Sequence, residues 1–308
     1  MMNSQMVPNH KKKRSVFLRH SMSDRAFFVV DLLVLLIVFV IILYPLLYVV
    51  SSSFSGGKML MGLSLIPERF SLEGYKAVFE YRDIWVSYKN SFVYTFVGTA
   101  LAMFVTVLCA YPLSRSDFKQ GKVALGLCVF TMYFSGGLIP TFLNIRSLGL
   151  INTMWSFLLP STLSVYNMLV VRTYFRSQIP GELRDSAQID GCGEWRYLVQ
   201  IVLPLSGSVL GVVALYYGVA RWNAYFDSMI YLQDRAKLPL QNILREILIV
   251  NTSVAELGIN AEAEAVAAER AELLKYSIIV LASLPMMMIY PFVQKSFVKG
   301  VMVGSVKG

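Results

Sequence analysis

The sequence predicts an all-α membrane protein with six transmembrane helices. Hydrophobic residues make up 56% of the 308 residues and charged residues only 15%, whereas soluble domains usually carry about 25% charged residues. The apolar residues are gathered in long runs, and the run over residues 26–50 contains a single charged residue, Asp31. An α-helix needs about 20 apolar residues to cross a bilayer core of about 30 Å. This run also lacks the polar face that a soluble helix would show.

Six apolar runs are long enough to be spans. They cover residues 25–53, 86–113, 122–143, 151–174, 198–232 and 276–293. The first run is longer than the apolar part of a signal peptide, which is about 7–15 residues, and it lacks a small-residue cleavage site, so we expect it to be retained. The third run contains Gly136, Gly137 and Pro140, which predict a kink.

The lysines and arginines set the predicted orientation. They gather at the N-terminus, between spans two and three, between spans four and five, and after span six, whereas the loop between spans five and six is rich in glutamate. Because cytosolic segments carry an excess of Lys and Arg, we expect both termini in the cytosol. The predicted domains are a basic cytosolic tail over residues 1–24, a transmembrane domain over 25–298 and a cytosolic tail over 299–308. This topology accounts for the net charge of +9, and we expect no binding of nucleic acid.

Several kinds of chemistry have no residues to support them. Both histidines, His10 and His20, lie in the N-terminal tail, and the three cysteines have no metal-ligand spacing. We therefore expect no metal site, no catalytic residues and no cofactor bound by this chain. The sequence also contains no G-x-x-x-x-G-K-[ST] phosphate loop, so any process driven by ATP would need another chain to bind the nucleotide.

One cytosolic segment, residues 179–204 between spans four and five, is more than a connector. Pro180 can begin a helix, because the first helical N–H has no partner anyway, and acidic residues in the first turn suit the helix dipole. Gly191 and Gly193 are expected to end the helix or to let it bend. We expect a short helix within residues 180–197 that lies outside the bilayer and is rigidly joined to span five. Such a helix could transmit a movement of a cytosolic partner to the membrane-spanning helices.

This segment resembles the coupling motif of ABC importer permeases. The motif reads Glu-Ala-Ala, three residues, Gly, nine residues, Ile, one residue, Leu-Pro. Here Asp185-Ser186-Ala187 stands in place of Glu-Ala-Ala, Gly191 follows after three residues, and the final residues keep the motif's spacing. The resemblance implies that the segment couples the membrane domain to an ATPase. The residues that it assigns to this coupling are Glu182, Asp185, Ser186, Ala187, Asp190, Gly191, Ile201, Leu203 and Pro204.

The resemblance extends over most of the chain. Trp222-Asn223 is similar to a pair common in carbohydrate permeases, and residues 134–143, 240–249 and 294–308 resemble maltose-transporter-like permeases that serve oligosaccharide and polysaccharide-fragment importers, chiefly of Gram-positive bacteria. The family implies a type I importer permease with six helices in the bacterial cell membrane, surrounded by membrane lipid. It implies a second permease subunit, two cytosolic ATPases that bind ATP and Mg, and an extracellular solute-binding lipoprotein as partners. The implied substrate is a sugar, an oligosaccharide or a polysaccharide fragment.

Polar and aromatic residues within the apolar runs are candidates for the substrate pathway. Intramembrane polar residues usually face the interior of the helix bundle, and sugars are often held by aromatic faces and by amides. The candidates are Tyr166, Asn167, Tyr216, Trp222 and Asn223. The alternative is that the aromatic residues form interface belts and the amides bridge helices. For Trp222 and Asn223 the sequence favours neither interpretation.

Two other functions compete with the permease interpretation. A secondary transporter driven by an ion gradient would need inverted repeats and buried ionisable residues, and the spans show no convincing repeat and few such residues. A membrane enzyme would need a catalytic set that the sequence lacks. Two external segments also have helical patterns: the aromatic residues near 70–79 suggest an amphipathic helix, and residues 261–274 are either an extension of span six or a docking surface.

Overall fold

The structure, a computed structural model, describes residues 22–55, 69–257 and 274–291, and these residues are helical almost throughout, with no strand among them. Three helices are long and apolar enough to cross a membrane: α1 (Met22–Ser53), α3 (Arg82–Ser114) and the last described helix, Leu274–Pro291. Two bent pairs can each form one more span. The described residues therefore hold three spans, or up to five if each bent pair counts as one. The result is a helical, multi-pass membrane protein, as predicted.

The bent pairs correspond to predicted spans three and five. Helices α4 (Gly121–Tyr133) and α5 (Leu138–Ser147) meet at 114°, and Gly137, between them, has a φ of 86° that a residue with a side chain rarely adopts. The predicted kink at the Gly136–Pro140 cluster is thus confirmed. The fifth span bends by 83° between Glu194–Leu205 and α11 (Gly207–Asn223).

The fourth predicted span, residues 151–174, is the one that the structure interrupts. Instead of one helix it contains α6 (Met154–Leu158) and α7 (Val165–Gln178), with residues 159–164 outside either helix. Pro160 lies in the interruption and has no N–H to continue a helical ladder. Ser164 then begins α7 by accepting a hydrogen bond from the Asn167 N–H at 3.3 Å. Pro160 and Ser164 thus account for the division of this predicted span into two helices.

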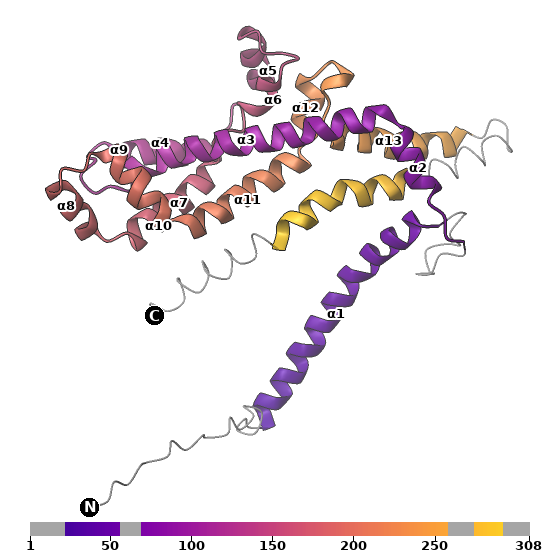
Figure 1. The fold of residues 1–308 in the computed structure, drawn as a ribbon, viewed down its shortest axis with the longest axis horizontal. Helices are drawn as coiled ribbons and strands as arrows, with labels where there is room; N and C mark the ends of the chain where they lie inside the picture. Colours follow the sequence, from indigo (N-terminus) through magenta and orange to yellow (C-terminus); the bar gives the residue numbers. More distant parts are fainter. Residues whose placement is uncertain (1–21, 56–68, 258–273, 292–308) are drawn as a thin grey trace, which may run out of the picture.

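Helix α3 is the centre of the fold, and α7 and α11 pack along it (Figure 1). Its buried face is built from small residues that allow close approach of neighbouring helices. These residues are Ser87, Ser91, Gly98, Ala102, Thr106 and Ala110. At Gly98 a Cβ atom would lie 3.0 Å from Leu158 Cδ2 and 3.1 Å from Arg221 Nε, so a side chain at this position would require these neighbours on α6 and α11 to shift.

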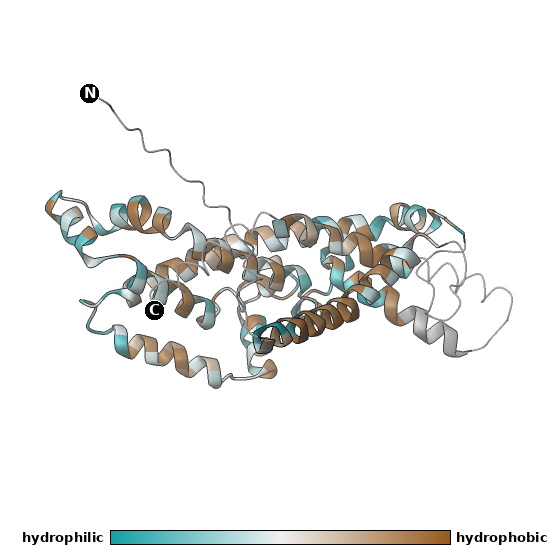
Figure 2. Ribbon diagram, turned by 90° about the horizontal axis from the view of Figure 1, so that it is seen from below, coloured by the Kyte–Doolittle hydropathy of each residue, from teal (hydrophilic) through white to brown (hydrophobic). Residues whose placement is uncertain are grey.

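Helix α1 lies apart from this bundle (Figure 1). It is apolar around its whole circumference, and Figure 2 shows it brown along nearly its whole length. Only Ser52 and Ser53, in its last turn, are buried. A helix with this composition is stable only where lipid or another protein surrounds it.

The remaining helices lie near the two ends of α3. At one end are α8 (Gly181–Ile189) and α9 (Glu194–Tyr197); at the other are α2 (Glu73–Glu80) and α13 (Leu240–Leu257) (Figure 1). The shorter elements are the π-helix Leu198–Val202, α10 (Leu203–Leu205), α12 (Phe226–Tyr231) and the 3₁₀-helix Arg235–Lys237. Helix α2 is the amphipathic helix expected near residues 70–79, and its Tyr75 hydroxyl pairs with the Ser53 hydroxyl at 2.8 Å. The predicted helix 261–274 and the tails over 1–21 and 292–308 lie outside the described residues.

Candidate coupling site

Helix α8 owes its boundaries to Pro180 and Gly191. Pro180 is the N-cap, with extended backbone angles of −60° and 140°. After the helix, the Gly191 N–H donates to Gln188 O at 3.0 Å and the Cys192 N–H donates to Ala187 O at 2.8 Å. This pair of bonds is the Schellman motif, which needs its first donor residue in the left-handed conformation, and Gly191 has a φ of 72°. The glycine of the coupling motif thus ends the helix, as expected, and the predicted segment 180–197 contains two short helices rather than one.

The two sides of α8 have opposite environments. Ala187 is 7% exposed and packs in a buried cluster with Tyr197 and Leu198. On the other side, Ile189 is 87% exposed although it is apolar. The other residues of the coupling motif in this stretch are all exposed: Glu182, Asp185, Ser186, Asp190 and Gly191. The helix is therefore packed against the protein through Ala187 and exposes most of its other residues.

Two further apolar residues of this segment are exposed. Leu183 on α8 is 41% exposed and Trp195 on α9 is 63% exposed. With Ile189 they are the large apolar residues that α8 and α9 expose, and we call these three residues the α8–α9 patch. Exposed apolar residues that cluster on a rigid element are typical of an interaction surface. Leu183, Ala187 and Ile189 are all apolar, but the structure buries Ala187 and exposes the other two.

The second half of the motif forms the π-helix and α10. The Leu203 N–H donates to Leu198 O, five residues earlier, which is the bond of a π turn. Pro204 explains this irregularity, since it has no N–H and its ring would clash with the carbonyl four residues before it. Ile201 and Leu203 are half-buried against the cluster that holds Ala187, while Pro204 is exposed. The motif's last residues thus build the joint between α9 and α11.

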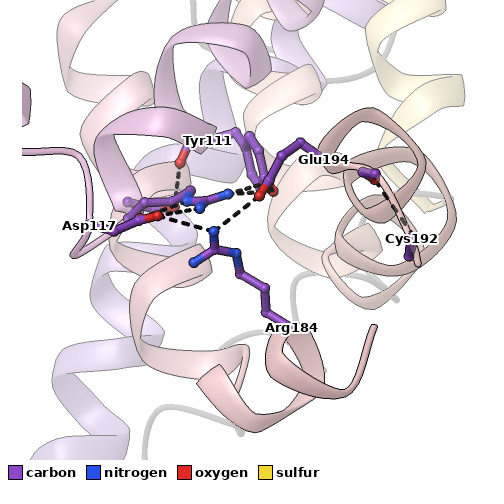
Figure 3. A network of polar contacts seen from close by, with 8 residues as sticks. Tyr111, Asp117, Arg184, Cys192 and Glu194 are labelled. Carbon is purple, nitrogen blue, oxygen red and sulfur yellow. Dashed lines mark hydrogen bonds and ion pairs between the residues drawn. The ribbon is translucent and has the colours of Figure 1, made fainter. Parts of the chain in front are cut away.

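An ionic network holds this joint to the end of α3 (Figure 3). Arg115, just after α3, pairs with Asp117 and with Glu194 at the start of α9. Arg184 of α8 reaches the same two acids, with its Nη2 atom 3.1 Å from Asp117 Oδ2 and 3.0 Å from Glu194 Oε1. The Tyr111 hydroxyl also donates to Glu194 at 2.6 Å. No sequence motif indicated this network, because its members come from three separate segments.

The charged groups in the network shift each other's pKa values. Burial alone would lower the pKa of Arg115, but its hydrogen bonds to Asp117 and Tyr111 and the nearby carboxylates raise that pKa above its ordinary value. The hydrogen bonds from Arg115 in turn hold the pKa of the Asp117 carboxyl below its ordinary value. Both groups therefore keep their charges at neutral pH. Single exposed ion pairs contribute only about 0.2–1 kcal/mol, so the network acts through the geometry that it fixes.

The candidate pathway residues are not brought together as one group. Trp222 is 2% exposed, its indole N–H donates to Ala282 O at 3.0 Å, and its ring packs edge-on against Phe92. Asn167 is also buried, whereas Tyr166, Tyr216 and Asn223 are exposed. The Asn223 side chain donates to Val219 O within its own helix. For Trp222 this geometry favours the interpretation as a helix-packing residue.

A Trp222→Phe variant separates the two interpretations. If the indole packs helices, its loss removes one hydrogen bond of about 1 kcal/mol and lowers the thermal stability of the subunit. The apparent affinity for the substrate should then stay unchanged in a transport assay. A weaker apparent affinity with unchanged thermal stability would instead assign Trp222 to substrate contact.

Two residues of α11 hold the interruption of the fourth span. Arg221 is 5% exposed, and its guanidinium donates to Phe157 O at 3.0 Å and to Leu158 O at 2.7 Å. One turn earlier, the Tyr217 hydroxyl accepts from the Ser164 N–H at 3.0 Å and pairs with Thr106 Oγ1 at 2.8 Å. Backbone groups freed by an interruption inside a membrane must find such partners. An arginine within an apolar run was the signal in the sequence for this role.

Comparisons with known proteins identify relatives over nearly the whole chain. No protein-family model matches it. It is 39% identical over 293 residues to Protein LplC of Bacillus subtilis, covering 94% of this chain and 98% of that protein. It is also 39% identical over 276 residues to the polygalacturonan/rhamnogalacturonan transport system permease protein YtcP of the same organism, covering 89% of this chain and 96% of that protein. The crystal structure of a bacterial ABC transporter involved in the import of the acidic polysaccharide alginate matches with a TM-score of 0.80 and 31% identity, over 90% of this chain and 99% of that one.

The fold and these relatives define a membrane-embedded transport subunit. The chain belongs to the family of sugar ABC transporter permeases, which confirms the resemblance drawn from the coupling motif. A permease of this family is not an enzyme, and the ATPase is a separate subunit. The competing interpretations as an ion-driven transporter or a membrane enzyme are therefore rejected.

Proposed function

We propose that this chain forms half of the channel of an importer for oligosaccharides or polysaccharide fragments. Support for the substrate class comes from the relatives: YtcP is described as a polygalacturonan/rhamnogalacturonan permease, GanQ of B. subtilis as a galactooligosaccharide permease, and the similar solved structure as a transporter involved in the import of alginate. These substrates are chains of sugar units.

The proposed topology has six spans with both termini in the cytosol of a bacterial cell, in its cell membrane. The three long helices and two bent pairs supply five spans. The sixth would be the interrupted α6–α7 segment, whose freed carbonyls find donors on α11. The tails over residues 1–24 and 299–308 would then be cytosolic, with the permease domain over residues 25–298 between them.

The proposed assembly contains a second permease subunit, two cytosolic ATPases and an extracellular solute-binding lipoprotein, surrounded by membrane lipid. ATP and Mg would be bound by the ATPases and no cofactor by this chain, in line with the missing phosphate loop. The family membership supports this arrangement, because subunits of this class work with a separate ATPase.

We assign the coupling to α8, and the observation that carries the assignment is the exposure of Ile189. An apolar side chain that is 87% exposed on a helix fixed from its other side is suited to enter a groove of a partner. Glu182, Asp185, Ser186 and Asp190 would surround this contact, while Ala187 and Gly191 fix the helix. Ile201, Leu203 and Pro204 would pass its displacement into α11.

The substrate pathway is proposed to run past the exposed members of the candidate set. These are Tyr166 at the start of α7, and Tyr216 and Asn223 on α11. Asn167 and Trp222 would support the pathway from behind, since both are buried. An aromatic ring and an amide are the groups expected to receive a sugar's C–H face and hydroxyls.

An Ile189→Asp variant tests the coupling assignment. Its side chain has few neighbours within the chain, so we expect unchanged membrane insertion and thermal stability but a loss of ATPase co-purification by at least about tenfold, the cost of about 1.4 kcal/mol. Gln188→Asp, which adds the same charge at the adjacent exposed position, is the matched control and should retain the ATPase. Normal ATPase binding by Ile189→Asp would refute the assignment.

A further inference from the structure

A cleft of about 290 Å³ lies between the start of α8 and the ends of α3 and α7. Three segments line it: the end of α3 with Tyr111 and Arg115, the end of α7 with Arg176, and the start of α8 with Gly181 and Arg184. Among the described residues, three arginines line the cleft and no acidic residue does. Nothing in the coupling mechanism above uses this space.

The arginines differ in how many of their N–H donors remain without an acceptor. The guanidinium of Arg115 donates hydrogen bonds to Asp117, Glu194 and Tyr111. Arg184 donates to the same two acids through Nη2 alone, and its buried Nε has no hydrogen-bond partner in the described part of the chain. Arg176 is exposed and makes no ion pair with any other described residue. A buried donor without an acceptor costs about 1–3 kcal/mol, so Arg184 is poised to receive a further acceptor.

The backbone adds donors at the same place. Helix α8 begins at Gly181, which lines the cleft, and its N-cap residue, Pro180, offers no side-chain hydrogen bond to the first turn. The first N–H groups of a helix lack partners within it, and the helix dipole places partial positive charge there. Glu182, also in this turn, is exposed and does not line the cleft. Free arginine donors and backbone N–H groups thus converge on one space, which is the chemistry of a phosphate site.

The position of the cleft points to the source of the phosphate. Ser114, which lines it, is the last residue of α3, a helix long and apolar enough to cross a membrane, so the cleft lies at one end of a spanning helix. With the cytosolic orientation of the proposed function, on which this step rests, this is the depth of the inner headgroups. Anionic lipids concentrate there and bind basic pockets between transmembrane helices.

We propose that the cleft binds the phosphate of an anionic phospholipid headgroup, held by Arg176, Arg184 and the first turn of α8. The bound headgroup joins the end of α7 to α8, two elements that the ionic network does not connect. It stiffens the coupling helix against the membrane domain, and transport then depends on the lipid composition of the inner leaflet.

Lipid retention by the transporter tests this site directly. The complete transporter is reconstituted in phosphatidylcholine bilayers with and without phosphatidylglycerol, and the phosphatidylglycerol that stays bound is counted by native mass spectrometry. Arg176→Gln should bind it about tenfold more weakly, as expected for losing one charged hydrogen bond. Arg196→Gln is the matched control, because Arg196 is exposed, bonds to Gln200 and does not line the cleft. It should stay within about twofold of the unaltered protein.

Several results would overturn the proposal. If Arg176→Gln retains as much phosphatidylglycerol as the unaltered protein, no lipid binds in the cleft. If Arg176→Gln and Arg196→Gln lose phosphatidylglycerol equally, the lipid is attracted by the overall charge and not by the cleft. If inorganic phosphate stabilises the protein in phosphatidylcholine alone and Arg176→Gln removes that effect, the ligand is a free phosphate. If Arg176→Gln changes the stability of the protein only when the ATPases are attached and phosphatidylglycerol is absent, an acidic side chain of the ATPase fills the cleft. Retention does not require transport, so this test can fail while the Ile189→Asp test succeeds, and the reverse.

Discussion

An Arg221→Met variant is expected to be clearly less stable in its folded, membrane-embedded form. Methionine fills a similar apolar volume but donates no hydrogen bond, so Phe157 O loses the donor that the structure provides, while Leu158 O keeps only the Thr162 hydroxyl at 2.9 Å. An unsatisfied buried acceptor costs about 1–3 kcal/mol, which is a large share of the stability margin of a typical protein, about 5–15 kcal/mol. Removing a buried charge returns part of this cost, but Phe157 O remains buried without a donor. Size-exclusion chromatography after heating measures the loss.

Two comparisons separate the role of Arg221 from a general effect of removing an arginine. Arg221→Lys keeps the charge and can still donate, so it should recover part of the lost stability. Arg245→Met removes an exposed arginine of α13 and should leave stability nearly unchanged. If Arg221→Met were as stable and as active as the unaltered chain, the interruption of the fourth span would not depend on α11.

An Ala187→Arg variant is expected to insert into the membrane but to lose both ATPase association and uptake. Ala187 is 7% exposed and packs against Tyr197 and Leu198, so a long charged side chain cannot fit without displacing α8. Overpacking of this kind costs about 1–3 kcal/mol, and desolvation of the new charge adds to it. Because α8 is held mainly by the packing of Ala187 and by the ion pairs of Arg184, we expect the helix to detach rather than the bundle to unfold. Co-purification of the ATPase with the permease is the measurement.

The neighbouring residue provides the control for this prediction. Ser186→Arg introduces the same side chain at an exposed position of α8, and it should leave the helix attached to the bundle. Protease protection of the segment distinguishes a detached helix from an attached one. Full ATPase binding by Ala187→Arg would mean that Ala187 does not fix the helix in the assembled transporter.

Features with local causes could be predicted from the sequence. Helix α3 follows its apolar run to within four residues at its start and one at its end, and Gly191 ends α8 because of its own backbone freedom. The kink near Gly137 likewise needs only the glycines and proline around it. The residues of the coupling motif were placed on a short helix and its connection to span five, where the structure has them.

Features that depend on distant partners could not be predicted. The fourth span is interrupted at Pro160, but its stability in the bilayer depends on Arg221, about 60 residues later in the chain, whose partners no local pattern reveals. The same holds for Arg115 and Glu194, which meet only because α9 packs beside the end of α3. Hydropathy also could not tell that Ala187 faces the protein while Ile189 faces outward, since both are apolar.

The π-helix between α9 and α11 shows why the spacing of the coupling motif matters: it determines how the helix is rotated on either side of the π turn. Each residue added to or removed from a helix rotates the rest of the helix by about 100°, since an α-helix has 3.6 residues per turn. The extra residue of the π turn at Leu198–Val202 therefore sets the direction in which α9 points relative to α10. An insertion or deletion between Glu194 and Ile201 would rotate α9, with Glu194 and Trp195, away from its present neighbours while every contact residue remained present. A change in the number of residues in this segment should therefore disturb coupling more than the presence of Asp-Ser-Ala in place of Glu-Ala-Ala.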